Sequence, residues 1–251
     1  MKTVLTVLAF CILYSTRVQS QGDTVIRGVP IHFDYSHNIF PESWRVTPVS
    51  GTGGSLERGE RQRSKLILSR SLVKYPVHIL QRNLRSVFVL RFMKFYNVGY
   101  GGTNSDMDIF ITNDGNVLGY SDKYIEQTFH HEFSSILFRN HPALFDEPAW
   151  KNCNPPGFDY TDPENGVGAI RNNRSSQEID TALCRLGFLT QYAMSGLEND
   201  INTIAQNLFK PADQFWETVD LYPSLTAKTR LLILFYQQLD PVFTETYFRN
   251  Q

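Results

Sequence analysis

The segment His130-His131-Glu132 holds the densest cluster of side chains in this chain that could bind a metal or transfer a proton. His131 and Glu132 match the start of the pattern H-E-x-x-H, in which two imidazoles one helical turn apart bind zinc and the glutamate activates the bound water. Ser135 stands where the second histidine would be, and its hydroxyl is a weak zinc ligand. The chemistry of the segment therefore depends on which other side chains complete the site.

Residues 121–140 are predicted to form an amphipathic helix that carries this cluster and ends before Pro142. At about 100° per residue, the apolar side chains that share one arc about 120° wide are Ile125, Phe129, Phe133, Ile136 and Leu137. Glu132 lies at the edge of this arc, where partial dehydration raises the pKa of a carboxyl group. His131 projects beside Glu132, and His130 projects from the opposite flank. Glu132 is therefore the candidate catalytic base, and both histidines are candidate metal ligands.

A third ligand and a metal-free alternative both have to be considered for this helix. His141 follows His131 at the spacing of the third ligand in H-E-x-x-H-x-x-G-x-x-H enzymes. Phe138 replaces the turn glycine of that longer pattern, which directs His141 away from the site. Two neighbouring histidines can also be hydrogen-bonded residues between a helix and a sheet, with no metal. On spacing alone, this second interpretation stays open.

The elements around the helix are predicted from the spacing of apolar residues and from the positions of glycine and proline. Strands are expected over residues 25–33, 86–92 and 107–112, and a flexible connection over 99–103. Further helices are expected over 56–74, 77–80, 177–192, 197–209, 211–221 and 224–239, and an irregular segment over 143–176. Strands that precede helices indicate an α+β fold, with a small mixed sheet followed by a mostly helical C-terminal half.

Residues 1–20 are predicted to be a signal peptide, and residues 21–251 a single domain. A basic start precedes an apolar run from Val4 to Tyr14, and Ser20 offers a small residue before the cleavage site. The run is too short to span a bilayer, and no later stretch is long and apolar enough to do so. We therefore expect an exported protein of the periplasm, the cell envelope or the cell exterior, without a transmembrane segment.

The composition is that of a folded protein. Hydrophobic residues make up 41% of the chain and aromatic residues 13%, which is enough for a packed core and argues against disorder. The formal net charge is −1, so no nucleic-acid partner is expected, because nucleic-acid-binding domains usually carry a basic surface. Cys153 and Cys184 remain after removal of the leader, and the sequence leaves open whether they form a disulfide or stay free thiols.

Several further segments carry a resemblance to a known family. They are Gly101-Gly102-Thr103, Phe129–Leu137, Gly187–Ser195, Glu198-Asn199-Asp200 and the tail that ends in Tyr247-Phe248. On these segments the chain resembles a group of exported candidate zinc-binding metallopeptidases common in Bacteroidetes. The resemblance would extend over residues 25–250 and implies a zincin-like fold. In the helix pattern of the family, His131 corresponds to the first zinc ligand and Glu132 to the general base, whereas Ser135 departs from the second ligand.

The resemblance also implies a third zinc ligand on the helix that follows residues 187–195. Glu198 is the nearest match, and Asp200 is an alternative. Ser195 and Glu198 also have the spacing of a capping box, in which the glutamate side chain satisfies the start of the helix instead. Both roles of Glu198 stay open at this point.

The expected function is that of an exported zinc-dependent hydrolase of the peptidase type, with a peptide or protein as substrate. His131, His130 and Glu198 would hold the zinc, and an extended substrate would lie against a sheet edge formed by residues 107–112. The alternative is a catalytically inactive binding protein of the cell envelope that keeps the peptidase fold, because the loss of one helix imidazole weakens zinc binding. A purely structural envelope protein is the third interpretation.

Overall fold

The structure of the chain is a computed structural model that describes residues 24–162 and 166–251. The predicted signal peptide, residues 1–20, lies outside the described residues, and the single domain over 21–251 stays a prediction. Among the helices of the two described ranges, none combines the length and the apolar character that crossing a membrane requires.

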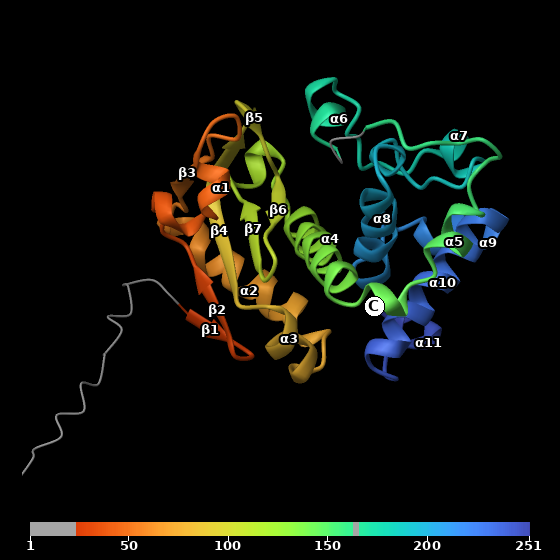
Figure 1. Cartoon of the computed structure of the whole chain (residues 1–251). Coiled ribbons are helices and arrows are strands. Elements are labelled where there is room, and N and C mark those ends of the chain that lie inside the picture. Colours follow the sequence, from red (N-terminus) through yellow and green to blue (C-terminus); the bar gives the residue numbers. More distant parts are fainter. Residues whose placement is uncertain (1–23, 163–165) are drawn as a thin grey trace, which may run out of the picture.

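A mixed sheet forms much of the N-terminal half of the described structure (Figure 1). Its seven strands within the described ranges are β1 (Thr24–Ile26), β2 (Val29–His32), β3 (Thr52–Ser55), β4 (Ser86–Phe95), β5 (Val98–Gly99), β6 (Gly102–Asn104) and β7 (Asp108–Thr112). The order across the sheet is β1, β2, β4, β7 and β6, and β3 and β5 also pair with β4. β4 runs parallel to β2 and β7, whereas β6 is antiparallel to β7 and forms one edge. The predicted mixed sheet is therefore confirmed.

Helices make up most of the C-terminal half. The α-helices of the described ranges are α1 (Glu42–Arg45), α2 (Arg58–Val73), α3 (Val77–Asn83), α4 (Asp122–Asn140), α5 (Glu147–Lys151), α6 (Val167–Arg171), α7 (Thr181–Cys184), α8 (Leu197–Phe209), α9 (Phe215–Leu221), α10 (Pro223–Leu239) and α11 (Glu245–Arg249). Figure 1 shows α4 between the sheet on one side and α8 on the other. The α+β class with a helical C-terminal half is confirmed.

Helix α4 has the position that the sequence predicts. The Ser121 hydroxyl accepts a hydrogen bond from the main-chain NH of Tyr124 (3.1 Å), which caps the start of the helix. Pro142 follows the last turn and prevents its continuation. The apolar arc, which includes Phe129 and Phe133, is buried, because α2 and the sheet cover one side of α4 and α8 covers another. This packing fixes α4 between the two halves of the molecule.

Four predicted elements differ from the observed ones. The segment expected to be irregular over 143–176 contains the short helices α5 and α6. The strand expected over 25–33 is a hairpin of β1 and β2, because Gly28 in its turn has a positive φ of 84°. The helix expected over 177–192 is wrong, since Gly187 has a φ of 85° and only the short α7 forms in this region, followed by a 3₁₀ turn. The connection expected over 99–103 is wrong as well, because most of it belongs to β5 and β6.

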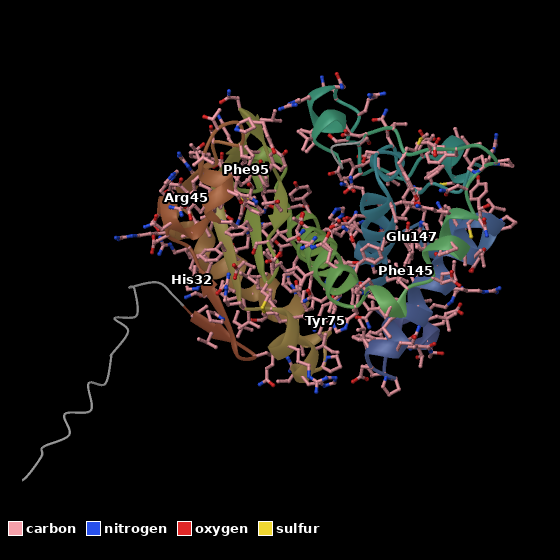
Figure 2. All side chains as sticks on the ribbon, viewed as in Figure 1. His32, Arg45, Tyr75, Phe95, Phe145 and Glu147 are labelled. Carbon is pink, nitrogen blue, oxygen red and sulfur yellow. The ribbon has the colours of Figure 1, made fainter. Side chains whose placement is uncertain are left out.

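One continuous hydrophobic core joins the sheet to the C-terminal helices. Tyr75, labelled in Figure 2, connects the two halves, because its ring contacts Phe133 of α4 and stacks on Phe209 of α8 with centroids 4.4 Å apart. A second cluster, which contains Phe110 of β7, covers the other face of the sheet. Strands β4 and β7 are thus buried on both faces, and the edge strand β6 is held against α4.

A buried ion pair connects the helices of the C-terminal half. Lys228 of α10 and Asp200 of α8 are 2.7 Å apart, and both side chains are fully buried. Asp200 also accepts hydrogen bonds from the indole of Trp150 and the hydroxyl of Tyr160, each at 2.9 Å. The segment over 143–176 is therefore tied to α8 by two aromatic side chains.

The two cysteines of this half are free thiols. The Cys153 thiol donates to the main-chain oxygen of Ala149 (3.3 Å), and the buried Cys184 thiol lies 3.8 Å from the oxygen of Leu189. Of the two possibilities that the sequence leaves open, the structure has the unpaired one.

Candidate functional site

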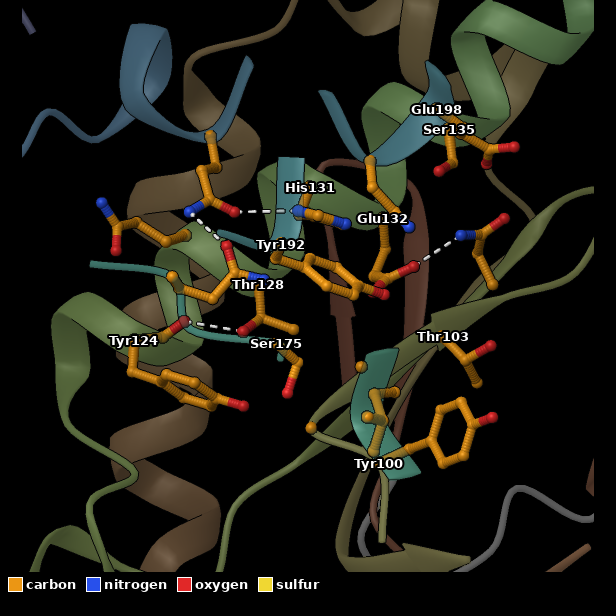
Figure 3. A pocket seen from close by; sticks show the side chains of 18 of the residues that line it. Tyr100, Thr103, Tyr124, Thr128, His131, Glu132, Ser135, Ser175, Tyr192 and Glu198 are labelled. Atoms are coloured by element: carbon orange, nitrogen blue, oxygen red, sulfur yellow. Dashed lines mark hydrogen bonds between the residues drawn. The ribbon is translucent and has the colours of Figure 1, made fainter. Parts of the chain in front are cut away.

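A polar cavity lies where β6, α4 and α8 meet (Figure 3). Its volume is about 440 Å³, which is within the range of pockets that take a small ligand or a long side chain. Among the described residues, the wall contains the carboxyl groups of Glu132 and Glu198, the guanidinium group of Arg139 and the rings of Tyr100, Tyr124 and Tyr192. The rest of the wall is largely neutral and polar, with amide and hydroxyl side chains. The cavity therefore suits a ligand that forms many hydrogen bonds.

Two glycines allow the edge of the sheet to lie directly against α4. A Cβ added to Gly101 would lie 1.8 Å from the Tyr124 hydroxyl, and one added to Gly102 would lie 2.4 Å from Cγ2 of Thr128. The Cβ on Gly102 would also lie 2.6 Å from Oε1 of Glu132. A side chain at either position would push the strand or its neighbours away. The close approach places the Glu132 carboxyl group beside the main chain of β6.

The outer edge of β6 borders the cavity. The oxygen of Gly101 accepts a hydrogen bond from β7 (2.8 Å), and the NH of Ser105 donates one to β7 (2.9 Å). Because such bonds alternate along an antiparallel pair, the main-chain groups of Gly102 and Asn104 point away from β7. The prediction that residues 107–112 form the sheet edge is therefore wrong, since β6 covers β7.

Glu132 occupies the wall of the cavity next to this edge. It is 7% exposed, and the amide of Asn104 donates a hydrogen bond to its Oε2. Burial raises the pKa of the Glu132 carboxyl to about 8 against the effect of that hydrogen bond, and the carboxylate of Glu198 adds to the rise. The carboxyl group therefore keeps its proton at neutral pH unless a positive charge approaches it.

Three of the hydrogen-bonded side-chain pairs between helices α4 and α8 are regularly spaced, and we term these three the polar ladder. The pairs are His131 with Gln206 (2.9 Å), Ser135 with Asn202 (2.5 Å) and Arg139 with Glu198 (2.8 Å). On each helix the members are spaced four residues apart, so they lie on one face. The residue numbers fall along one helix as they rise along the other, so the two helices are antiparallel.

The pair of His131 with Gln206 leaves one nitrogen of the His131 ring available to a ligand. We call each pair of the polar ladder a rung. Nδ1 bonds to Oε1 of Gln206, and the ring stacks on Tyr192 with centroids 6.1 Å apart (Figure 3). Burial lowers the pKa of the His131 imidazole, so the ring is neutral at pH 7. With its proton on Nδ1, the ring presents Nε2 as a hydrogen-bond acceptor.

The second pair of the ladder contains Ser135, the residue at the position of the second histidine in the pattern H-E-x-x-H. The amide nitrogen of Asn202 donates to the hydroxyl of Ser135, and Asn202 is 1% exposed. The amide fills the space between α4 and α8 that a longer side chain at Ser135 would need. Ser135 is therefore part of the helix interface and not only a shortened version of a metal ligand.

The third rung continues into the edge strand. Arg139 pairs with Glu198 and also donates hydrogen bonds to Oδ1 of Asn104 and to the main-chain oxygen of Ser105 (3.0 Å). Asn104 in turn donates to Glu132. A continuous hydrogen-bonded chain thus runs from α8 through Arg139 and Asn104 to the Glu132 carboxyl group.

The capping-box role of Glu198 is not observed. The residue that caps α8 is Gly196, without a side-chain hydrogen bond. The hydroxyl of Ser195 instead accepts a hydrogen bond from the amide of Asn199 (2.9 Å). The Glu198 carboxylate lies at the cavity and binds Arg139, so its role is in the site and not at the helix end.

His130 lies on the far side of α4 from the cavity. Its Nδ1 is 3.0 Å from the hydroxyl of Tyr75, and its ring stacks on Phe209 with centroids 4.9 Å apart. Burial and the ammonium group of Lys74 hold the pKa of the imidazole well below its ordinary value. It is neutral, so its Nε2, 4.0 Å from Oε1 of Glu126, does not form an ion pair. The structure does not bring His130 together with His131, Glu132 and Glu198.

The two remaining ligand candidates also lie outside the cavity wall. Nε2 of His141 is 3.0 Å from Oδ1 of Asn83, as expected for a helix that continues past Phe138. Asp200 is committed to the buried pair with Lys228. Neither contributes a donor to the site.

The donors in the cavity do not fit a catalytic zinc ion. Such an ion needs three protein ligands and an open position. Across residues 24–162 and 166–251, no group of three or more histidine, cysteine, aspartate or glutamate side chains is placed to hold a metal. His131 offers one nitrogen, but Ser135 is bonded to an amide and Glu198 to a guanidinium group.

Sequence reasoning missed Arg139, Asn104, Asn202 and Gln206. Arg139 lies two turns after Glu132 on the same helix, so its spacing was a usable signal. Glu198, Asn202 and Gln206 lie four residues apart and therefore on one face of α8, which was a second signal. A polar face that packs against another helix needs hydrogen-bonding side chains on that helix. No feature of the sequence indicates that Asn104 contacts Glu132, because the sequence does not predict strand β6, which carries Asn104.

No family model matches this sequence. No curated protein matches it either. Among solved structures, its fold is similar to that in the crystal structure of a candidate zinc-binding metallo-peptidase from Bacteroides caccae ATCC 43185, determined at 2.10 Å resolution. The TM-score is 0.56 at 16% sequence identity, and the similarity covers 88% of this chain and 85% of that chain. The chain therefore shares the fold of this Bacteroides protein.

Proposed function

We propose that this protein is an exported binding protein with a metallopeptidase-like fold, which holds an extended peptide or protein segment without a catalytic zinc ion. The observation that carries the proposal is the polar ladder. His131, Ser135 and Glu198 are the positions at which a zinc site of this type would take its ligands, and each is hydrogen-bonded across the α4–α8 interface. The proposal of export rests on the leader-like pattern of residues 1–20.

The open edge of β6 supports a peptide as the ligand. The main-chain groups of Gly102 and Asn104 point away from β7, and an extended peptide can add to such an edge as a further strand. The cavity beside this edge has room for side chains that alternate along the bound peptide. The amide and tyrosine side chains of its wall offer donors and acceptors to the rest of the ligand.

The zinc-dependent hydrolase predicted from the resemblance is not the function that this geometry supports best. Glu132 lies where that family has its general base, but a base of this kind acts on a water that zinc has activated. The donors that remain around His131 do not complete a zinc site. The inactive relative of a peptidase, the alternative drawn from the sequence, agrees better with the ladder.

A pair of matched glycine variants tests the proposed function. Gly102→Ala places a methyl group 2.4 Å from Thr128 and 2.6 Å from Glu132, whereas Gly59→Ala meets nothing within 4 Å. Binding of random short peptides is measured by fluorescence anisotropy in the presence of a chelator, and their integrity is checked by mass spectrometry. We expect uncleaved peptides to bind the unmodified protein and Gly59→Ala equally. Gly102→Ala should bind them about tenfold more weakly, because the methyl group displaces the edge of β6 or the Glu132 side chain that the peptide would contact.

Two results would contradict the proposal. Peptides that are cleaved only when the chelator is omitted would show a metal-dependent hydrolase. Equal affinity of Gly102→Ala and Gly59→Ala would show that peptides bind elsewhere on the molecule.

A further inference from the structure

The described residues contain four buried carboxyl side chains, and three of them have a cation as partner. The four are Asp108, Glu126, Glu132 and Asp200. Asp108 pairs with Arg85, Glu126 lies 2.9 Å from Lys74, and Asp200 lies 2.7 Å from Lys228. Glu132 accepts a hydrogen bond from the neutral amide of Asn104 and makes no ion pair with a described residue. Glu132 differs from the other three because no cationic group of the described residues contacts its carboxyl group.

The unpartnered oxygen of Glu132 faces the cavity. Asn104 bonds to Oε2, while Oε1 accepts no hydrogen bond from the described residues. Oε1 lies beside Gly102, which has no side chain to cover it, and Glu132 is one of the residues that line the cavity. A carboxyl oxygen of a side chain that is more than nine-tenths buried is thus directed at an open space.

The guanidinium group of Arg139 does not fill this role. It binds Glu198, Asn104 and the main-chain oxygen of Ser105. Among the described residues, the ionisable groups in the wall, apart from tyrosines and the neutral His131, are two carboxyl groups and this one guanidinium group. The charge of Arg139 acts on Glu132 from a distance, but no cationic group of the described residues contacts the Glu132 carboxyl group.

The surroundings of Glu132 suit an organic cation. The tyrosine rings in the wall of the cavity, at positions 100, 124 and 192, lie around the same space (Figure 3). Aromatic faces attract ammonium and guanidinium groups, and their rims accommodate the apolar stem of a long basic side chain. The volume of about 440 Å³ is large enough for such a side chain.

We propose that the cavity binds the cationic side chain of a lysine or arginine in the extended peptide, with the carboxylate of Glu132 as its partner. This inference rests on the proposed function, because the β6 edge positions the peptide. A residue that pairs with Gly102 has its side chain next to Oε1 of Glu132, since Gly102 presents none of its own. The class of ligand is therefore a basic peptide segment.

Two short blocked peptide libraries that differ at one fixed central residue test the inference. The residue is lysine in one library and Nε-acetyl-lysine in the other, which keeps the length and removes the charge. We expect the lysine library to bind about tenfold more tightly, and Glu132→Gln to reduce this ratio below about twofold. Glu147→Gln, which removes an exposed carboxylate paired with Lys151, should keep the full ratio.

The outcomes separate this inference from the proposed function. Equal binding of both libraries to the unmodified protein would overturn the lysine site and leave peptide binding intact. A ratio that stays at about tenfold in Glu132→Gln would also overturn it, because another group would then bind the cation. The absence of binding by either library would overturn both. The comparison of libraries needs no change in the protein, so it holds even if a variant is unstable.

Discussion

Two buried carboxyl groups, Asp200 and Glu132, have opposite surroundings in this molecule. Asp200 is enclosed between α8 and α10, with Lys228 at 2.7 Å and two further donors on the same oxygen. Glu132 faces a cavity, and among the residues that the structure describes it has one amide donor and no cation in contact. A carboxylate that is paired with a cation of the same chain contributes to the stability of the fold. A buried carboxylate without such a cation can instead pair with a cationic group of a ligand. The first region connects α8 to α10 in the C-terminal half, and the second is the proposed binding site.

The largest effect should come from removing the cation of the closed region. Lys228→Met keeps most of the apolar stem of the side chain but leaves Asp200 buried without its partner. We expect the free energy of unfolding to fall by about 3–5 kcal/mol, measured by urea denaturation. Lys151→Met, which breaks an exposed pair with Glu147, is the control and should cost less than about 1 kcal/mol. Similar small losses in both variants would show that the buried pair does not anchor this half.

Replacing Glu132 by glutamine should increase the free energy of unfolding at high pH, which is the opposite of the effect of Lys228→Met. The pKa of the carboxyl rises from 4.5 to about 8 in the folded protein, so the folded state holds the proton more tightly than the unfolded chain. The resulting stability is fully present below pH 4.5 and is lost as the pH rises towards 8. Glu132→Gln removes this dependence. Between pH 4 and pH 9, the stability of the unmodified protein should fall relative to that of Glu132→Gln by roughly 3–5 kcal/mol. Parallel stability curves of the two proteins between these pH values would contradict the raised pKa.

A smaller effect is expected where the polar ladder replaces a metal ligand. Ser135→His forces an imidazole against Asn202 and should cost about 1–2 kcal/mol of stability without creating a zinc site. The double variant Ser135→His with Asn202→Ala removes the amide, and we expect it to regain stability and take up zinc. Thermal melting and metal analysis after gel filtration measure both effects. Stoichiometric zinc in the single variant, at unchanged stability, would show that the ladder does not close this position.

Helix α4 and Glu132 were predictable because their signals are local. Ser121, the apolar arc and Pro142 define the helix, and the position of Glu132 at the edge of the arc indicates its burial. The opposite directions of His130 and His131 also follow from helical geometry. Helical geometry does not predict which residues surround the two histidines. Tyr75, which contacts His130, and Gln206, which contacts His131, come from distant parts of the chain.

The partners that decide the chemistry were not predictable from local patterns. Asn202 lies 67 residues after Ser135, and only the packing of α8 on α4 brings the two together. Strand β6 consists of Gly-Thr-Asn, which lacks the alternation of apolar residues that marks a strand. The pairing of β6 with β7 overrides this weak preference, so the sequence predicts a connection where the structure has the edge strand.

The central claim, that the ladder takes the place of a zinc site, is tested most directly by zinc binding to the unmodified full-length protein. Zinc is titrated into chelator-treated protein by calorimetry, and the metal that remains after gel filtration is quantified. We predict no stoichiometric zinc and the same peptide affinity before and after chelation. One tightly bound equivalent, lost in both His131→Ala and Glu198→Ala, would contradict the account.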